Sequence, residues 1–211
     1  MPANKQRCAW ADTTNDLMRQ YHDTEWGRPS HDNRHLFELL SLEIMQAGLS
    51  WQTVLNKRAA FKAAFADFDY QQVAQMTPQI PALLKNDQII RNRMKVTAMI
   101  KNANAVAQLV ANGTDFDHYV WNFVSNQPIQ HHIERHEQVP NTTDLAKQMS
   151  KQMKKDGFAF TGPVVVYSFM QAAGLVNDHE FRFLNGYFGQ FQFDPGALFQ
   201  LQTSCSCLDI A

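Results

Sequence analysis

The spacing of apolar residues predicts helices along almost the whole chain. These residues recur at intervals of three and four, which places them on one face of an α-helix. The stretches end at capping residues or glycines, and cover residues 32–47, 51–66, 91–110, 116–124, 144–156 and 164–173, with two short helices after Asp69 and Thr77. No segment shows strand alternation bounded by turns, so an all-α fold is expected, least defined from Phe181 onward.

Glu43 interrupts the apolar pattern of the first long helix. It shares a stripe with Leu36, Leu39, Leu40 and Ala47, and burying a lone carboxylate costs several kcal/mol or raises its pKa. Two interpretations follow from this spacing. Either Glu43 lies at the edge of an imperfect stripe and a neighbour satisfies it, or the apolar face lines a pocket in which Glu43 is the polar anchor.

Composition indicates a globular protein. The chain has 211 residues, of which 45% are apolar and 18% charged, and its net charge of −1 gives no overall attraction for polyanions. Residues 1–7 lack the apolar core of a signal peptide, and the apolar run at 164–169 is too short to cross a membrane. Three cysteines, Cys8, Cys205 and Cys207, form no disulfide framework, so a cytoplasmic protein without membrane association is expected.

A basic hairpin at residues 83–95 is the clearest candidate for nucleic-acid contact. It joins a short helix to a long one through a polar turn and an apolar pair, and its cations, with Lys101, surround a helix start that favours phosphate. The candidate contact residues are Gln88, Ile89, Ile90, Arg91, Arg93 and Lys95. The alternative is an ordinary solvated helix start, which is common for clusters of charge.

Six stretches in a fixed order carry a family resemblance. They are residues 8–10, 21–27, 42–51, 89–93, 119–124 and 157–179. With these stretches the chain resembles the 3-methyladenine DNA glycosylase I family, an outlying branch of the helix-hairpin-helix DNA glycosylases. The resemblance covers most of the chain and implies a single α-helical glycosylase domain over residues 1–211. It also implies a monomer that acts on alkylated double-stranded DNA.

The resemblance implies that 3-methyladenine is flipped into a pocket and removed by hydrolysis of its N-glycosidic bond. The methylated base is cationic, so recognition needs electron-rich rings and an acceptor for the exocyclic amine. Glu43 matches the family's recognition carboxylate, and is also the candidate catalytic residue if it polarises water. Trp51 matches the stacking aromatic, and Tyr21, Trp10 and Trp26 match further pocket walls; ordinary core packing is the alternative for each aromatic.

Family members lack the general-base aspartate and the Schiff-base lysine of other helix-hairpin-helix glycosylases, which implies a monofunctional hydrolase without lyase activity. The hairpin would hold one strand through backbone amides, leaving base sequence largely unread. Two departures bear on this site. Gln88 replaces the usual glycine before the paired isoleucines, and Met18 stands where some members have a second tyrosine.

A structural zinc site ties the chain ends together in many members of the family. Three of its four ligand positions hold suitable residues here, namely Cys8, His22 and His179. The fourth position is Phe183, which cannot bind metal. Either the site is lost, or Cys205 or Cys207 replaces the missing ligand, or water completes it; zinc with a substitute cysteine is expected. The terminal segments could then pack together as a small subdomain.

Two rival functions use the same residues differently. A non-catalytic binder of alkylated DNA would keep the aromatic pocket but release no base. A zinc hydrolase would use a metal-bound water at Cys8, His22 and His179, with Glu43 as base. His131, His132 and His136 also suggest a metal site, but a solvated connector is the preferred interpretation, because spacing alone is weak support.

Overall fold

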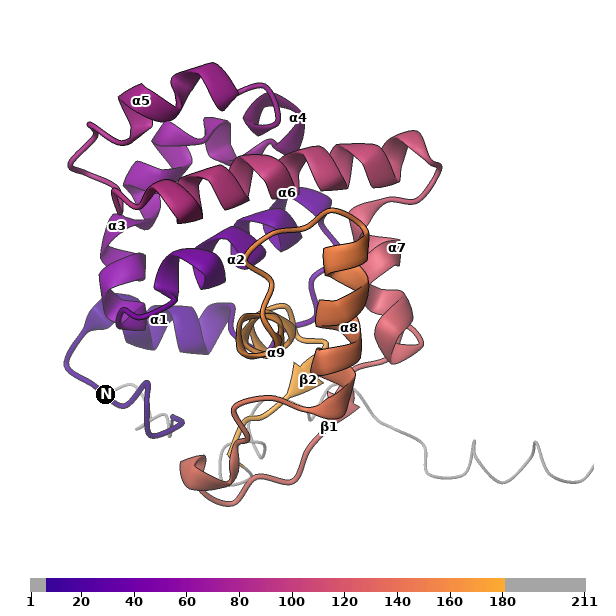
Figure 1. Ribbon diagram of the computed structural model, residues 1–211. Coiled ribbons are helices and arrows are strands. Elements are labelled where there is room, and N and C mark those ends of the chain that lie inside the picture. Colours follow the sequence, from indigo (N-terminus) through magenta and orange to yellow (C-terminus); the bar gives the residue numbers. More distant parts are fainter. Residues whose placement is uncertain (1–6, 181–211) are drawn as a thin grey trace, which may run out of the picture.

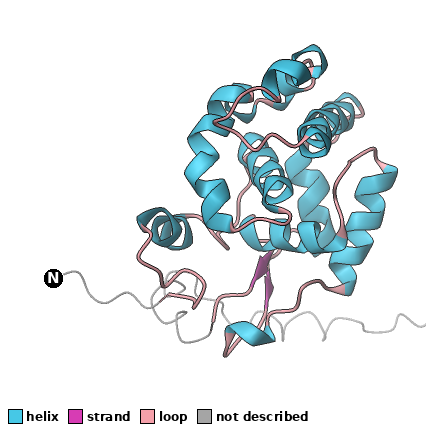
Figure 2. Cartoon of the chain, turned by 60° about the vertical axis from the view of Figure 1, so that its left-hand side comes forward, coloured by secondary structure: helices cyan, strands magenta, loops and turns pink. Residues whose placement is uncertain are grey.

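The computed structural model describes residues 7–180, and helices dominate this part of the chain (Figures 1 and 2). The α-helices are α1 Asp16–Thr24, α2 Asn33–Gln46, α3 Trp51–Ala64, α4 Tyr70–Val73, α5 Ile80–Leu83, α6 Arg93–Ala111, α7 Phe116–Trp121, α8 Asp144–Lys155 and α9 Pro163–Ala172. Short 3-10 helices are η1 Ala66–Phe68, η2 Thr77–Gln79, η3 Asn122–Val124 and η4 His136–Gln138. The predicted all-α fold is confirmed.

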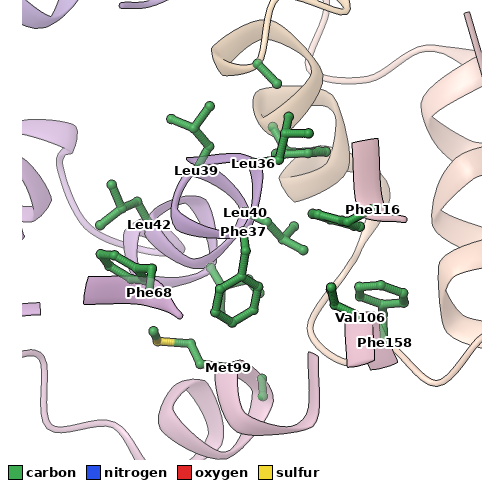
Figure 3. Packing of buried hydrophobic residues seen from close by; sticks show 14 of the residues in the cluster. Leu36, Phe37, Leu39, Leu40, Leu42, Phe68, Met99, Val106, Phe116 and Phe158 are labelled. Atoms are coloured by element: carbon green, nitrogen blue, oxygen red, sulfur yellow. The ribbon is translucent and has the colours of Figure 1, made fainter. Parts of the chain in front are cut away.

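Helix α2 lies at the centre of the molecule, between α6 and α9 (Figure 1). Every residue from Leu36 to Met45 is buried, so α2 is enclosed on all sides rather than along one stripe. Figure 3 shows Leu36, Phe37 and Leu42 pointing outward from α2 into different parts of the core. A helix packed in this way holds its side chains in fixed positions.

Side-chain caps begin the helices that position the functional residues. Asp32, and not Ser30, accepts from the N–H of His35 at the start of α2. Ser50 does the same for Thr53 at the start of α3, which places Trp51 in the first turn of that helix. These bonds satisfy N–H groups that have no partner within the helix.

Helix α1 and a pair of short strands were not predicted from the sequence. The strands β1 Ile129–Gln130 and β2 Val176–Asn177 form a parallel pair in which Ile129 lies opposite Val176. A two-residue strand is too short to show alternation, so neither strand was predictable from the residue pattern. β2 leads the chain from α9 toward His179.

Gly174 allows the end of α9 to lie directly against the segment before α2. Its φ is +75°, and a Cβ there would come within 2.4 Å of the backbone nitrogen of Pro29. The N–H of Ser30 donates to the carbonyl of Ala173 at 3.1 Å, which fixes the contact. A side chain at position 174 would therefore clash with backbone as well as strain the turn.

The two ends of the described chain meet. The N–H of Ala9 donates to Oε1 of Glu180 at 2.8 Å. The packing expected for the complete terminal segments involves residues outside 7–180 and stays a prediction. Within that range, no helix combines the length and the apolar character needed to cross a bilayer.

Candidate active site

A cavity of about 330 Å³ opens between α1, α2 and α3 on one side and α9 with residues 136–141 on the other. It brings together all of the predicted pocket residues, which are Trp10, Tyr21, Trp26, Glu43 and Trp51. Four elements and the segment before α1 contribute to its wall, so the tertiary fold assembles it. Met18 also lines the cavity, at the position where some family members have tyrosine.

Glu43 is buried in this cavity with only 6% of its surface exposed. It forms no hydrogen bond or ion pair with any residue in the range 7–180, and burial raises the pKa of its carboxyl to about 8. The first interpretation of Glu43 required a satisfying neighbour, which the described residues do not provide. Its position fits the alternative of a polar anchor in an apolar pocket.

The aromatic walls carry two further polar atoms without a protein partner. The Tyr21 and Trp51 rings lie 5.0 Å apart between centroids, at an angle of 51°. The Tyr21 hydroxyl and the Trp51 indole nitrogen are buried, and neither forms a hydrogen bond among the described residues. Such atoms are rare in folded proteins, and here both belong to residues that line the cavity.

The charge of Glu43 also acts on Tyr21. Burial first, and then the nearby Glu43 carboxylate, raises the pKa of the Tyr21 hydroxyl well above its ordinary value. The hydroxyl therefore stays protonated and available as a donor. Trp10 and Trp26 meet edge to face, with centroids 5.1 Å apart, and extend the aromatic wall away from Tyr21.

An ion network behind the cavity joins the three helices that form one wall. Arg58 of α3 donates to both carboxylate oxygens of Glu25, at 2.7 and 2.8 Å, and to Glu38 of α2 at 2.7 Å. Burial tends to raise the pKa of Glu25, but hydrogen bonds from His35 and Arg58 outweigh it and lower the value to about 2. The sequence interpretation missed this network, whose members lie far apart along the chain.

The hairpin places only some of its predicted residues on the surface. Arg91 and Arg93 are exposed, whereas Ile89 packs in the core. Ile90 is partly buried against that core. Gln88 does not adopt a positive φ, so this turn does not need the glycine usual in the family.

Lys95 corrects the predicted DNA-contact set. Its ammonium is buried and donates to the carbonyls of Met45, at 2.8 Å, and Ala47, at 2.6 Å. These carbonyls lie at the C-terminal end of α2, where a positive charge is favourable. Lys95 therefore stabilises the end of α2 and does not lie on the exposed face of the hairpin.

The three matched zinc positions, Cys8, His22 and His179, lie near one another, and the zinc site itself stays a prediction. The N–H of Cys8 donates to Nε2 of His22 at 3.3 Å, occupying the lone pair a metal would need. Without a metal, burial raises the pKa of the Cys8 thiol to about 12, and a bound metal ion would offset this by favouring the thiolate. In the described part of the chain, no three potential ligands are placed to hold a metal ion. Phe183, Cys205 and Cys207 lie outside the described residues.

The histidine-rich connector is only partly solvated. Nδ1 of His131 lies 2.5 Å from Oδ1 of Asp178, a carboxylate that also accepts from Tyr167. His136 lines the cavity. His132 and His136 are both exposed, and 62% of the His132 side chain is accessible. The preferred interpretation as a solvated connector therefore fits the exposed His132 and His136, although His136 also borders the cavity, and is incomplete for His131, which pairs with Asp178.

An all-α fold with a basic hairpin and an aromatic pocket defines a helix-hairpin-helix glycosylase. Residues 10–184 match the model of the family described as methyladenine glycosylase. The chain belongs to this methyladenine glycosylase family.

Three relatives illustrate the similarity. DNA-3-methyladenine glycosylase 1 of Escherichia coli (strain K12) is 45% identical over 175 residues, covering 82% of this chain and 93% of the relative. DNA-3-methyladenine glycosylase of Haemophilus influenzae is 42% identical over 174 residues, covering 82% and 94%. A crystal structure of a 3-methyladenine DNA glycosylase I variant in complex with 3-methyladenine is 39% identical, with a TM-score of 0.78, covering 82% of this chain and 93% of the other.

Proposed function

We propose that this protein is a DNA glycosylase that flips 3-methyladenine out of alkylated double-stranded DNA and hydrolyses its N-glycosidic bond. The observation that carries the proposal is the Glu43 carboxyl, which is buried in an aromatic cavity without a partner among residues 7–180. The names of the similar proteins support the same substrate. We further expect a cytoplasmic monomer.

The cavity suits a flat cation. The faces of Tyr21 and Trp51 attract positive charge through their π-electrons. Glu43 would accept a hydrogen bond from the exocyclic amine, and a cationic base beside it would lower its pKa and favour the carboxylate. Unmodified adenine is neutral and offers no charge to offset the burial of a carboxylate, so it would bind less well.

In the reaction, the bond between the sugar C1′ and the base N9 breaks, and its electron pair neutralises the positive charge of the base. Water then adds to C1′ and loses a proton. Glu43 is the candidate group for polarising that water. No lysine lines the cavity among the described residues, which supports a monofunctional hydrolase, because lyase activity requires an amine to form a Schiff base.

The test is release of free base from methylated duplex DNA, measured by chromatography. The wild-type protein should release 3-methyladenine, and Glu43→Gln should release it at least tenfold more slowly. The variant loses at least one hydrogen bond between the base and a charged carboxylate, and that loss corresponds to a factor of this size. Glu134→Gln is the matched control, since this carboxylate is 64% exposed. Tight binding of methylated duplex without base release would instead indicate a non-catalytic damage binder.

A further inference from the structure

Lys57 connects helix α3 to the tip of the hairpin. Its ammonium donates to the carbonyl oxygens of Asp87, at 3.2 Å, and Gln88, at 2.9 Å. Lys57 is half-buried, and within residues 7–180 no carboxylate pairs with it. Its positive charge is therefore applied to the backbone of the hairpin rather than neutralised by an acid.

The two carbonyls belong to the peptide units that contribute the N–H groups of Gln88 and Ile89. An ammonium on a carbonyl oxygen polarises the N–H of the same peptide and strengthens it as a donor. The N–H of Gln88 donates to Oδ1 of Asn86 at 3.0 Å. No hydrogen bond among the described residues uses the N–H of Ile89 or Ile90.

These N–H groups lie just before a helix start that already favours an anion. Helix α6 begins at Arg93, capped by Asn92, and the positive end of its dipole faces the hairpin. Arg91 and Arg93 are exposed beside it. The ammonium of Lys57, on the carbonyls of Asp87 and Gln88, therefore adds a full positive charge to the partial charge of the helix start.

We propose that Lys57 is a positioning residue for DNA: it holds the hairpin carbonyls so that the N–H groups of Ile89 and Ile90 meet a phosphate of the bound strand. The inference rests on the proposed function. Because Lys57 contacts only the backbone of position 88, it holds the turn whether that residue is glutamine or glycine. It also links the hairpin to the helix that begins with Trp51 in the cavity.

The test compares Lys57→Met with the wild type for affinity to an undamaged duplex and for base release from methylated duplex. We expect about tenfold weaker duplex affinity and about tenfold higher KM, from the loss of charged hydrogen bonds, with kcat and affinity for free 3-methyladenine unchanged. Lys57→Arg should recover most of the loss. Lys62→Met is the matched control on the same helix, because Lys62 lies 3.4 Å from Glu38 and does not contact the hairpin.

Amide hydrogen exchange gives a readout that does not depend on DNA. In the free protein, the amide of Gln88, which donates to Asn86, should exchange faster in Lys57→Met than in the wild type, while those of α2 stay unchanged. Duplex affinity equal to that of the wild type would overturn the role of Lys57, as would an equal loss of affinity for the free base. A wild-type protein that binds no duplex would overturn the proposed function itself, and the role of Lys57 with it.

Discussion

Glu43 should cost the folded protein stability at neutral and alkaline pH. Its pKa is about 8 in the folded state and about 4.3 in an unfolded chain. Because the folded pKa is raised, the contribution of Glu43 is fully favourable below about pH 4.3 and is lost as pH rises toward 8. Between these values the folded protein binds one more proton than the unfolded chain.

The expected slope follows from this difference of one proton. The free energy of unfolding should fall by about 1.4 kcal/mol per pH unit, giving a total near 3.5 kcal/mol between pH 5 and pH 8. Glu43→Gln has nearly the same shape but does not titrate. Its stability relative to the wild type should therefore rise by that amount over this range, a large share of the stability of a typical domain.

Urea denaturation of both proteins at several pH values measures this quantity. Taking the difference between them cancels the titration of all groups common to both, and leaves that of Glu43. Two parallel curves would refute the reasoning, since they would mean that Glu43 titrates at the same pH in the folded and unfolded states. A rising difference would show that the protein keeps a destabilising carboxylate in its cavity.

Three further predictions concern substrate binding at Glu43 and Tyr21, and the role of the buried Lys95. If the substrate cation requires ionised Glu43, KM for methylated duplex should fall by up to about fifty-fold from pH 6 to pH 8, and Glu43→Gln should show no such dependence in steady-state kinetics. Tyr21→Phe removes a buried hydroxyl without a partner, so calorimetry should show a gain of about 1 kcal/mol in stability while base affinity falls several-fold. Lys95→Met should lower the free energy of unfolding by roughly 2–3 kcal/mol, with a smaller effect on duplex affinity than Arg93→Met has.

Helix positions were largely predictable because the chain marks helix starts and ends locally. Asp32, Ser50 and Asn92 act as caps where the sequence suggested helix starts. Helix α1 escaped because it contains few apolar residues, although its capping residue Asn15 accepts from the N–H of Met18 and offered a signal. Caps are short-range signals, whereas strand pairing between β1 and β2 depends on residues far apart in the chain.

A charged residue spaced among the apolar residues of a helix was interpreted as buried at Glu43, but the same spacing was overlooked at Lys95. Both are charged residues at buried positions of a helix. Lys95 lies one turn before Met99 of α6, a fully buried residue, so its burial was readable from spacing. The acceptors of Lys95, at the end of α2, could not be read in this way because they depend on tertiary packing.

The enclosure of α2 has a consequence for motion within the cavity. A helix packed on all sides opens only when the whole domain unfolds, so Glu43 is held on one of the least mobile parts of the protein. The opposite wall includes residues 136–141, where regular structure is limited to the short turn η4. We therefore expect any adjustment to an incoming nucleotide to occur in residues 136–141 rather than at Glu43.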